Sequence, residues 1–313
     1  MSSPPSSKDA SVILATRNRD DVLAQTLSHL GRQATGDLSW EVIVVDNGST
    51  DGTSGVLADA ARRLPLVSLR ESAPGKNRAL NQALAVARGE LLIFTDDDVI
   101  ADPGWIANLV GASRRWPTAT IFGGRIQLAF PPGTPAWLKE PLHGAMNFAR
   151  YAPAEPEGQT THLPNGPNFA VRATALQGLR YREDIGPQAG TAYAMGSETE
   201  LIVRLRERGA TMVYVPSATV EHVVQPNQLT DRYLFGRSYR LGRGQVRNRQ
   251  SHHEADVFLL RAPRYLWRSA LSSGVGFFLG LAGGRKRRLA SGLRLFFYLG
   301  CIAEHRAAHA AKA

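Results

Sequence analysis

Three consecutive aspartates, Asp96, Asp97 and Asp98, follow directly after an apolar run at residues 91–95. The run is short and lacks helical spacing, so it predicts a buried strand that delivers carboxylates to its carboxyl end. Ligands of open α/β sheets bind at that edge. Asp96 and Asp98, one residue apart, point the same way and offer the oxygen ligands that Mg²⁺ or Mn²⁺ prefers. A solvated acidic turn is the simpler interpretation of these three residues taken alone.

The residues before the aspartates alternate between strand and helix patterns. Strand patterns cover residues 12–15, 41–45, 66–69 and 91–95, and helix patterns cover residues 22–30, 56–64 and 75–87. Such alternation indicates βαβ units and a parallel sheet. Polar residues follow the strands at Thr16 and Arg17, at Asp46 and at the aspartates, so we expect them to meet along one edge. Because the ligands of such sheets bind at this edge, these polar residues predict a nucleotide site there.

These segments carry a family resemblance. The segments concerned are residues 12–19, 42–53, 75–81 and 91–98, followed downstream by Gly123-Gly124, residues 165–172, residues 196–201 and His222. In this order they resemble family 2 glycosyltransferases, the inverting sugar-nucleotide enzymes of the GT-A fold. The resemblance implies a Rossmann-like, mostly parallel sheet with helices on both faces. One departure is that the family's usual Glu-Asp pair reads Ser197-Glu198 here.

The resemblance implies roles for the acidic residues. Asp98 would bind the divalent metal, and Asp96 would touch the ribose and help with the metal. Asp97 would line the nucleotide site, or point away as a structural carboxylate. His222 would complete the metal site as a neutral imidazole, with a purely structural histidine as the alternative.

The resemblance also implies a nucleotide cradle. Its residues would be Thr16, Arg17, Asn18, Asp46 and Gly48. Asp46 resembles the residue that hydrogen-bonds the base. Lys76 resembles a lysine that contacts the base or the phosphates, with Arg78 as the alternative for that task and a surface lysine as the simpler interpretation.

Glu198 is the candidate general base, because the acceptor hydroxyl must lose a proton as it attacks the anomeric carbon. It stands at the start of a predicted helix, where the helix dipole favours a carboxylate. Capping is the competing interpretation, since Ser197 and Glu200 fit a capping box.

The charge divides the chain unevenly. Residues 231–313 hold 16 Lys and Arg against 4 Asp and Glu, whereas the whole chain has a net charge of +10. This part contains aromatic, apolar helix patterns and the basic run Arg285-Lys286-Arg287-Arg288. Basic residues beside apolar helices favour an anionic membrane surface on the cytoplasmic side. Packing on the rest of the chain or on a second subunit, as in a homodimer, remains open, as does a shallow span or re-entrant hairpin. No recognition motif for nucleic acid is present.

The sequence therefore predicts three parts: a disordered leader at 1–9, a GT-A catalytic domain at 10–230 and a basic amphipathic helical appendix at 231–313. Residues 10–125 would bind the nucleotide-sugar and residues 126–230 the acceptor. The leader lacks the apolar core of a signal peptide, which favours a cytoplasmic enzyme, peripheral on the membrane.

The predicted function is an inverting glycosyltransferase that moves a sugar, from a UDP-sugar by preference, to a glycan or lipid-linked acceptor in bacterial-type polysaccharide or glycolipid synthesis. A sugar-nucleotide nucleotidyltransferase is one alternative, although residues 15–19 lack the glycines of a phosphate loop. A non-catalytic nucleotide-binding or scaffold protein is the other.

Overall fold

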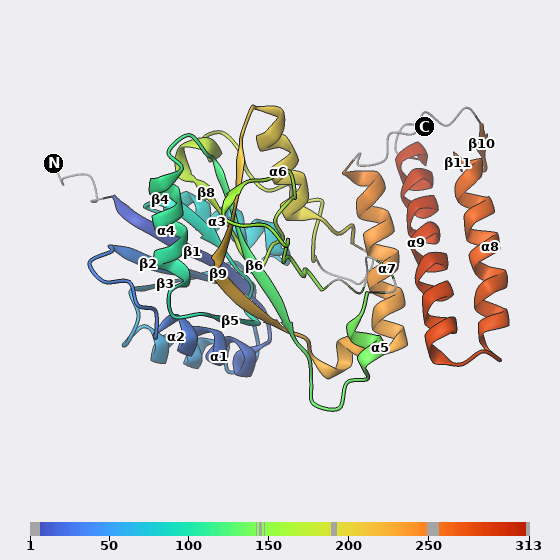
Figure 1. Ribbon diagram of the computed structural model, residues 1–313, viewed down its shortest axis with the longest axis horizontal. Coiled ribbons are helices and arrows are strands. Elements are labelled where there is room, and N and C mark those ends of the chain that lie inside the picture. The colour runs from blue at the N-terminus through green and yellow to red at the C-terminus, as the bar shows by residue number, and fades with distance from the viewer. Residues whose placement is uncertain are drawn as a thin grey trace. The chain divides into compact units, whose positions relative to one another are not determined.

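The computed structural model describes residues 7–141, 143, 146, 148–188, 193–248 and 257–310 (Figure 1). The chain forms two compact units. The sheet unit comprises Met1–Ala129, Ala149–Glu183 and Ser197–Val223, and the helical unit comprises Phe130–Phe148, Asp184–Gly196 and Val224–Ala313. In the last of these segments, a 3-10 helix at Pro226–Leu229 leads directly into the first long helix.

The sheet unit is built on a mostly parallel sheet, as predicted. Its strands are β1 (Lys8–Thr16), β2 (Trp40–Asp46), β3 (Leu66–Arg70), β4 (Gly89–Phe94), β5 (Val99–Ala101), β6 (Ile121–Ala129), β7 (Gly158–Gln159), β8 (Phe169–Arg172) and β9 (Met212–Val223). Its helices are α1 (Asp20–Leu30), α2 (Thr53–Ala60), α3 (Lys76–Val86), α4 (Trp105–Arg115), α6 (Ser197–Glu207) and the 3-10 helix η2 (Ala173–Leu176). The strand order is β3-β2-β1-β4-β8-β6-β9-β5, with β7 beside β9.

The first four strands pair in parallel, with β1 between β2 and β4 and β2 beside β3. Strand β8 runs antiparallel to β4 and to β6. The first strand begins at Lys8, so the expected end of the leader at residue 9 falls inside β1. Residues 1–6 of that leader lie outside the described residues.

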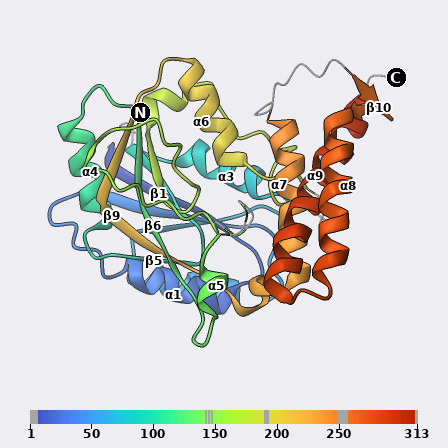
Figure 2. The ribbon, with the colours of Figure 1, turned by 45° about the vertical axis from the view of Figure 1, so that its right-hand side comes forward.

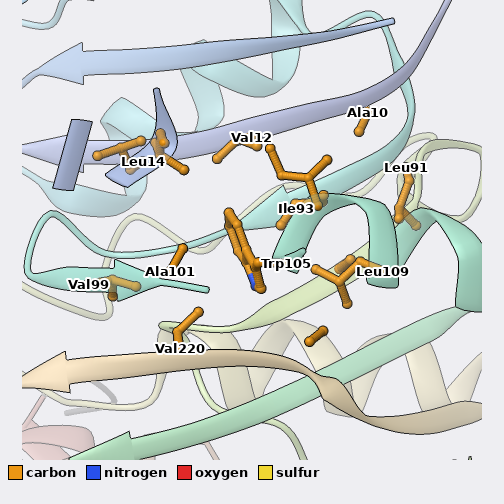
Figure 3. Packing of buried hydrophobic residues seen from close by; sticks show 14 of the residues in the cluster. Ala10, Val12, Leu14, Leu91, Ile93, Val99, Ala101, Trp105, Leu109 and Val220 are labelled. Carbon is orange, nitrogen blue, oxygen red and sulfur yellow. The ribbon is translucent and has the colours of Figure 1, made fainter. Parts of the chain in front are cut away.

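Helices cover both faces of the sheet because successive strand residues point to opposite sides. Val12 and Leu14 of β1 pack with apolar residues of α1, α2 and α4. Ile13, between them, packs with residues of α3 and α6 on the other face. Figure 2 shows α1 and α6 on opposite sides of the strands. In Figure 3 the indole of Trp105, from α4, lies among the strand side chains of the first face.

The helical unit contains three long helices. Its elements are α5 (Ala136–Lys139), η3 (Pro226–Leu229), α7 (Asp231–Arg247), β10 (Phe258–Leu259), β11 (Ala262–Pro263), α8 (Arg264–Gly280) and α9 (Arg285–Ala310). Helix α9 packs between α7 and α8 (Figure 1). The ring of Phe235 on α7 stacks on Phe296 of α9 at 4.9 Å and meets Phe277 of α8 edge-on at 5.8 Å. Among the described residues, no helix is long and apolar enough to cross a membrane.

Candidate active site

The sheet topology brings the polar strand ends together. Thr16, the last residue of β1, pairs with Asp46 at the end of β2. Strand β4 lies on the other side of β1, and the three aspartates follow within four residues of its end at Phe94. Carboxyl ends of neighbouring parallel strands share one edge, so this arrangement confirms the shared edge expected from the sequence.

Arg19 holds two of the three aspartates. Its guanidinium lies 2.6 Å from Oδ1 of Asp97 and 2.9 Å from Oδ2 of Asp98. The hydroxyl of Thr16 donates to the other oxygen of Asp97 at 2.7 Å. Asp97 thus anchors Arg19 and Thr16, and it is not part of the cluster that could hold a metal. Its position matches the structural alternative left open for it.

Burial and neighbouring charge act on these groups in opposite directions. Burial raises the pKa of Asp97 to about 6, although Arg19 opposes the shift. Burial acts in the same sense on Asp98, but His222 and Arg19 outweigh it and lower the pKa of Asp98 below its usual range. Burial disfavours the charge of Arg19, yet the carboxylates overcome that cost and raise its pKa. Asp98 is therefore a carboxylate at neutral pH.

Strand pairing delivers His222 to the aspartates. Strand β5 begins directly after Asp98 and runs antiparallel to β9, where Val99 pairs with His222. The amide of Val223 also donates to the carbonyl of Asp98 at 3.0 Å. The imidazole Nε2 of His222 consequently lies 3.1 Å from Oδ1 of Asp98, more than a hundred residues away in the sequence.

Asp96, Asp98 and His222 form a group that suits a divalent cation. Each offers one ligand atom, and these atoms lie within 4.8 Å of one another. The buried Oδ1 of Asp98 faces Nε2 of His222 at 3.1 Å. Two carboxylates and an imidazole are ligands that Mg²⁺ or Mn²⁺ accepts. The residues present therefore fit the metal that the sequence predicted.

Lys76 links this group to Glu198. Its ammonium lies 2.6 Å from Oδ1 of Asp96 and 3.2 Å from Oε1 of Glu198. Burial opposes the charge of Lys76, but the two carboxylates prevail and raise its pKa. Around the edge, the four carboxylates of the aspartates and Glu198 thus face the cations Arg19 and Lys76. The carboxylates outnumber the positively charged groups, so the cluster carries an excess negative charge that a divalent cation would balance.

Glu198 stands in the first turn of α6, close to the main chain of Gly166. A Cβ atom at Gly166 would come 2.8 Å from the carboxylate of Glu198, so a larger residue there would displace that carboxylate. Glu200, two residues on, pairs instead with Arg204 at 2.7 Å and makes a structural contact. At the start of α6, Glu198 therefore faces the cluster, whereas Glu200 supports the fold.

Tyr181 is a buried neighbour of this pair. Its hydroxyl has no hydrogen-bond partner among the described residues, and its ring meets Phe94 edge-on at 5.7 Å. Burial raises the pKa of the hydroxyl well above its usual range, and Glu198 adds to the shift while Lys76 opposes it. Tyr181 is therefore a neutral donor beside the carboxylate cluster.

The loop after β2 is organised by its own polar groups. One oxygen of Asp46 accepts from the amide of Ser49 at 2.8 Å, and the other lies 3.4 Å from Arg70. Asn18 fastens the loop to β1 because its side-chain oxygen accepts from the amide of Thr50 at 2.8 Å. Gly48 has φ +74°, a conformation that favours glycine.

The structure places some of the predicted residues at the carboxylate cluster and others away from it. Lys76 reaches the carboxylates, whereas Arg78 pairs with Glu183 at 3.0 Å, so Lys76 is the better placed of the two. Arg17 is exposed and forms no ion pair with another described residue. Sequence reasoning missed the contacts of Arg19 and Arg70 with the aspartates. The signal for Arg19 was its place between the end of β1 and the start of α1, at the same sheet edge as the aspartates.

An α/β sheet with an acidic cluster at its carboxyl edge, and a helix-start glutamate beside that cluster, suits an enzyme that acts on a nucleotide-sugar. The family model of Glycosyl transferase family 2 matches residues 11–179, more than half of the chain. The chain belongs to this family.

Two named relatives show what this chain is similar to in sequence. The chain is 29% identical over 226 residues to the pre-mycofactocin glycosyltransferase of Mycobacterium tuberculosis H37Rv, covering 70% of this chain and 44% of that protein. The chain therefore spans less than half of that relative's length. It is 23% identical to the succinoglycan biosynthesis protein ExoM of Rhizobium meliloti, covering 90% of this chain and 87% of that protein.

Two solved structures share the fold. A mannosyltransferase of Pyrobaculum calidifontis in complex with GDP-Man and Mn²⁺ has a TM-score of 0.62 and 18% identity, covering 96% of this chain and 88% of that chain. TarS 1–349 of S. aureus in complex with UDP-GlcNAc has a TM-score of 0.56 and 15% identity, covering 97% and 92%. Both confirm the predicted GT-A fold.

Proposed function

We propose that the protein is an inverting, metal-dependent glycosyltransferase that takes a sugar from a nucleoside diphosphate donor, preferentially UDP. The observation that carries this proposal is the joint presence of the Asp96, Asp98 and His222 group and of Glu198, linked by one lysine. The acceptor we propose is a glycan or a lipid-linked sugar in polysaccharide or glycolipid synthesis. The name of ExoM supports polysaccharide synthesis, and the ligand of TarS supports a UDP-sugar.

Asp98, with Asp96 and His222, would hold a divalent cation, and the Mn²⁺ of the Pyrobaculum enzyme supports Mn²⁺ or Mg²⁺. When bound, the cation supplies positive charge to the diphosphate leaving group. Asp46 and the loop that it organises would hold the nucleotide. Arg19 keeps Asp97 and Asp98 in place, so the metal ligands are oriented before the donor binds.

The reaction we propose is a single displacement. Glu198 takes the proton of the acceptor hydroxyl while its oxygen forms a bond to the anomeric carbon. The bond between that carbon and the diphosphate oxygen breaks, and the anomeric configuration inverts. Lys76, between Asp96 and Glu198, connects the donor side with the base and adds positive charge near the leaving group.

We further propose that the protein acts at the cytoplasmic face of a membrane. The described part of residues 231–310 holds 14 Lys and Arg against 2 Asp and Glu, which favours an anionic surface. A homodimer through the same helices is the alternative to membrane binding that the sequence left open.

The first test is hydrolysis of a panel of nucleotide sugars, with UDP- and GDP-linked donors each measured with Mn²⁺, with Mg²⁺ and with EDTA. We expect slow, metal-dependent release of a nucleoside diphosphate from one or a few UDP-sugars. Release of pyrophosphate from a sugar phosphate and a nucleoside triphosphate, without donor hydrolysis, would instead favour a nucleotidyltransferase.

Asp46→Ala should weaken nucleotide binding by roughly 1.5–3 kcal/mol, the range for a hydrogen bond to a charged group. Calorimetric titration with UDP measures this loss. The matched control is Arg70→Ala, which removes the 3.4 Å partner of Asp46 and keeps the carboxylate. If Asp46→Ala and the parent protein bind UDP with equal affinity, other residues hold the nucleotide base. If Asp46→Ala and Arg70→Ala lose the same amount of affinity, Asp46 supports the loop and does not contact the nucleotide.

A further inference from the structure

Helix α8 carries its large apolar side chains on the outside of the helical unit. Leu271, Val275, Phe278 and Leu279 are 71%, 53%, 69% and 70% exposed. Their spacing along the helix places them on one face. Leu281, directly after the helix, continues this face and is 56% exposed. We call these five residues the outer apolar face.

The opposite face of α8 combines large and small residues. Ala270, Ser273 and Gly280 are buried there together with Leu266, and Phe277 meets Phe235 of α7. A Cβ atom at Gly280 would come 2.9 Å from the main chain of Arg288, and one at Gly276 would come 3.1 Å from Ser291, both on α9. The side of α8 that faces α9 therefore needs small residues for close approach. The outer apolar face still departs from the usual pattern of a surface helix, which turns its polar residues outward.

Close glycine contacts also join α7 to α9. A Cβ atom at Gly242 would come 2.0 Å from the carbonyl of Phe297, and one at Gly300 would come 2.1 Å from the carbonyl of Tyr239. Helices that associate through small residues, with large apolar residues outside, are typical of an apolar surrounding. Because α8 has only 17 residues and no described helix is long and apolar enough to span a bilayer, the pattern fits a helix that lies in the interface.

Exposed cations lie at both ends of the outer apolar face. Arg264 and Arg268 occupy the first turns of α8, and Lys286 and Arg287 follow its end. None of the four forms an ion pair with another residue in the described ranges. In contrast, Arg285 and Arg288, which belong to the basic run expected to bind lipid, both pair with Asp231, at 2.9 and 2.7 Å.

The positions of these cations favour one of two possible partners for the outer apolar face, which are a second copy of the chain and a lipid surface. In a symmetric contact between two copies, the same patch meets itself, which would bring cations of one copy toward cations of the other. Like charges in such a contact repel one another. An anionic lipid surface instead offers phosphates to the cations and acyl chains to the apolar face.

We propose that the outer apolar face of α8 docks on an anionic lipid bilayer, with its leucines and Phe278 at the boundary of headgroups and acyl chains. Arg264, Arg268, Lys286 and Arg287 contact the lipid phosphates. This inference deepens the proposed membrane partner. It assigns docking to α8, whereas the apolar residues of α9 are used in part to pack against α7 and α8.

The test is cosedimentation of the full chain with vesicles of phosphatidylcholine alone and of equal parts phosphatidylcholine and phosphatidylglycerol. We expect binding to the anionic vesicles only, and weaker binding at high salt because exposed charges are screened. The double variant Arg268→Ser/Arg287→Ser should bind roughly thirtyfold more weakly, given the contribution of each basic side chain near the surface. Phe278→Ser/Leu279→Ser should abolish binding.

Matched controls change exposed residues of the same kinds in the sheet unit. Arg32→Ser/Arg206→Ser and Val86→Ser should bind as the parent does. Donor hydrolysis without vesicles should be unchanged in all variants, so loss of docking is distinguishable from failure of the proposed enzymatic function. Indifference of the parent to anionic vesicles, or parent-like binding by both α8 variants, overturns the proposal. A parent dimer that Phe278→Ser/Leu279→Ser converts to a monomer overturns it as well, in favour of a second copy on this face.

Discussion

Asp98→Ala should abolish sugar transfer and the metal-dependent part of nucleotide binding together. Asp98 is the buried carboxylate of the candidate metal group, and its Oδ1 faces the imidazole of His222 at 3.1 Å. Removing it leaves Asp96 as the one carboxylate of this group, so the cation loses a buried ligand and half of the group's negative charge. The measurements are turnover of the donor and titration of UDP with and without Mn²⁺.

The fold should survive this change. Arg19 loses one of its two carboxylates but keeps Asp97 at 2.6 Å. Thermal unfolding of the variant checks this point, and Asp102→Ala, which removes an exposed carboxylate four residues away, is the matched control. Turnover of the parent that is unchanged in excess EDTA would refute the metal role of Asp98.

Glu198→Gln should lower turnover by about 10²–10⁴-fold, the usual contribution of a positioned general base. The amide keeps the size of the side chain but cannot take up the proton of the acceptor. Donor binding should stay nearly intact, because the candidate nucleotide residues lie on the strand ends and the loop after β2. Single-turnover transfer measures the first effect, and titration of the donor measures the second.

Glu198→Asp provides the control, since the family usually carries the shorter acid at this position. It should retain more turnover than Glu198→Gln, because the carboxylate is kept even though its reach is shorter. A loss below tenfold in Glu198→Gln, with a lower unfolding temperature, would indicate a capping residue of α6 rather than a base.

Much of the sheet unit could be predicted because each of its parts leaves a local pattern. Apolar runs marked β1 to β4, and the parallel arrangement followed from the helices between them. The sheet edge could be predicted as well, since parallel strands end on one side. The proximity of His222 to Asp98 came from the family resemblance, and its physical reason, the antiparallel pairing of β5 with β9, was visible only in the structure.

Contacts between side chains that are distant in the sequence leave no local pattern, so they could not be predicted from it. Arg19 and Asp97 lie 78 residues apart and meet because β1 and β4 are neighbours in the sheet. The choice between Lys76 and Arg78 depended on which side of α3 faces the carboxylates. The first turn of that helix carries both residues, and only the fold shows that Arg78 points to Glu183.

The helical unit was harder to interpret. The basic run at 285–288 suggested one cationic surface, yet Asp231 holds two of its arginines. The apolar character of α8 and α9 was visible in the sequence, but the side that each helix buries was not. The sequence signal for the buried side of α8 was the spacing of Gly276 and Gly280, which mark the close approach to α9.

The most direct measurement is a crystal structure of the protein with UDP and Mn²⁺, recorded with anomalous diffraction from manganese. The proposed mechanism predicts one anomalous peak bonded to Asp98 and to diphosphate oxygens, with the nucleotide along the ends of β1 and β2 and Glu198 open to the acceptor. UDP bound at this edge without a metal peak, or a metal peak remote from Asp98, would contradict it.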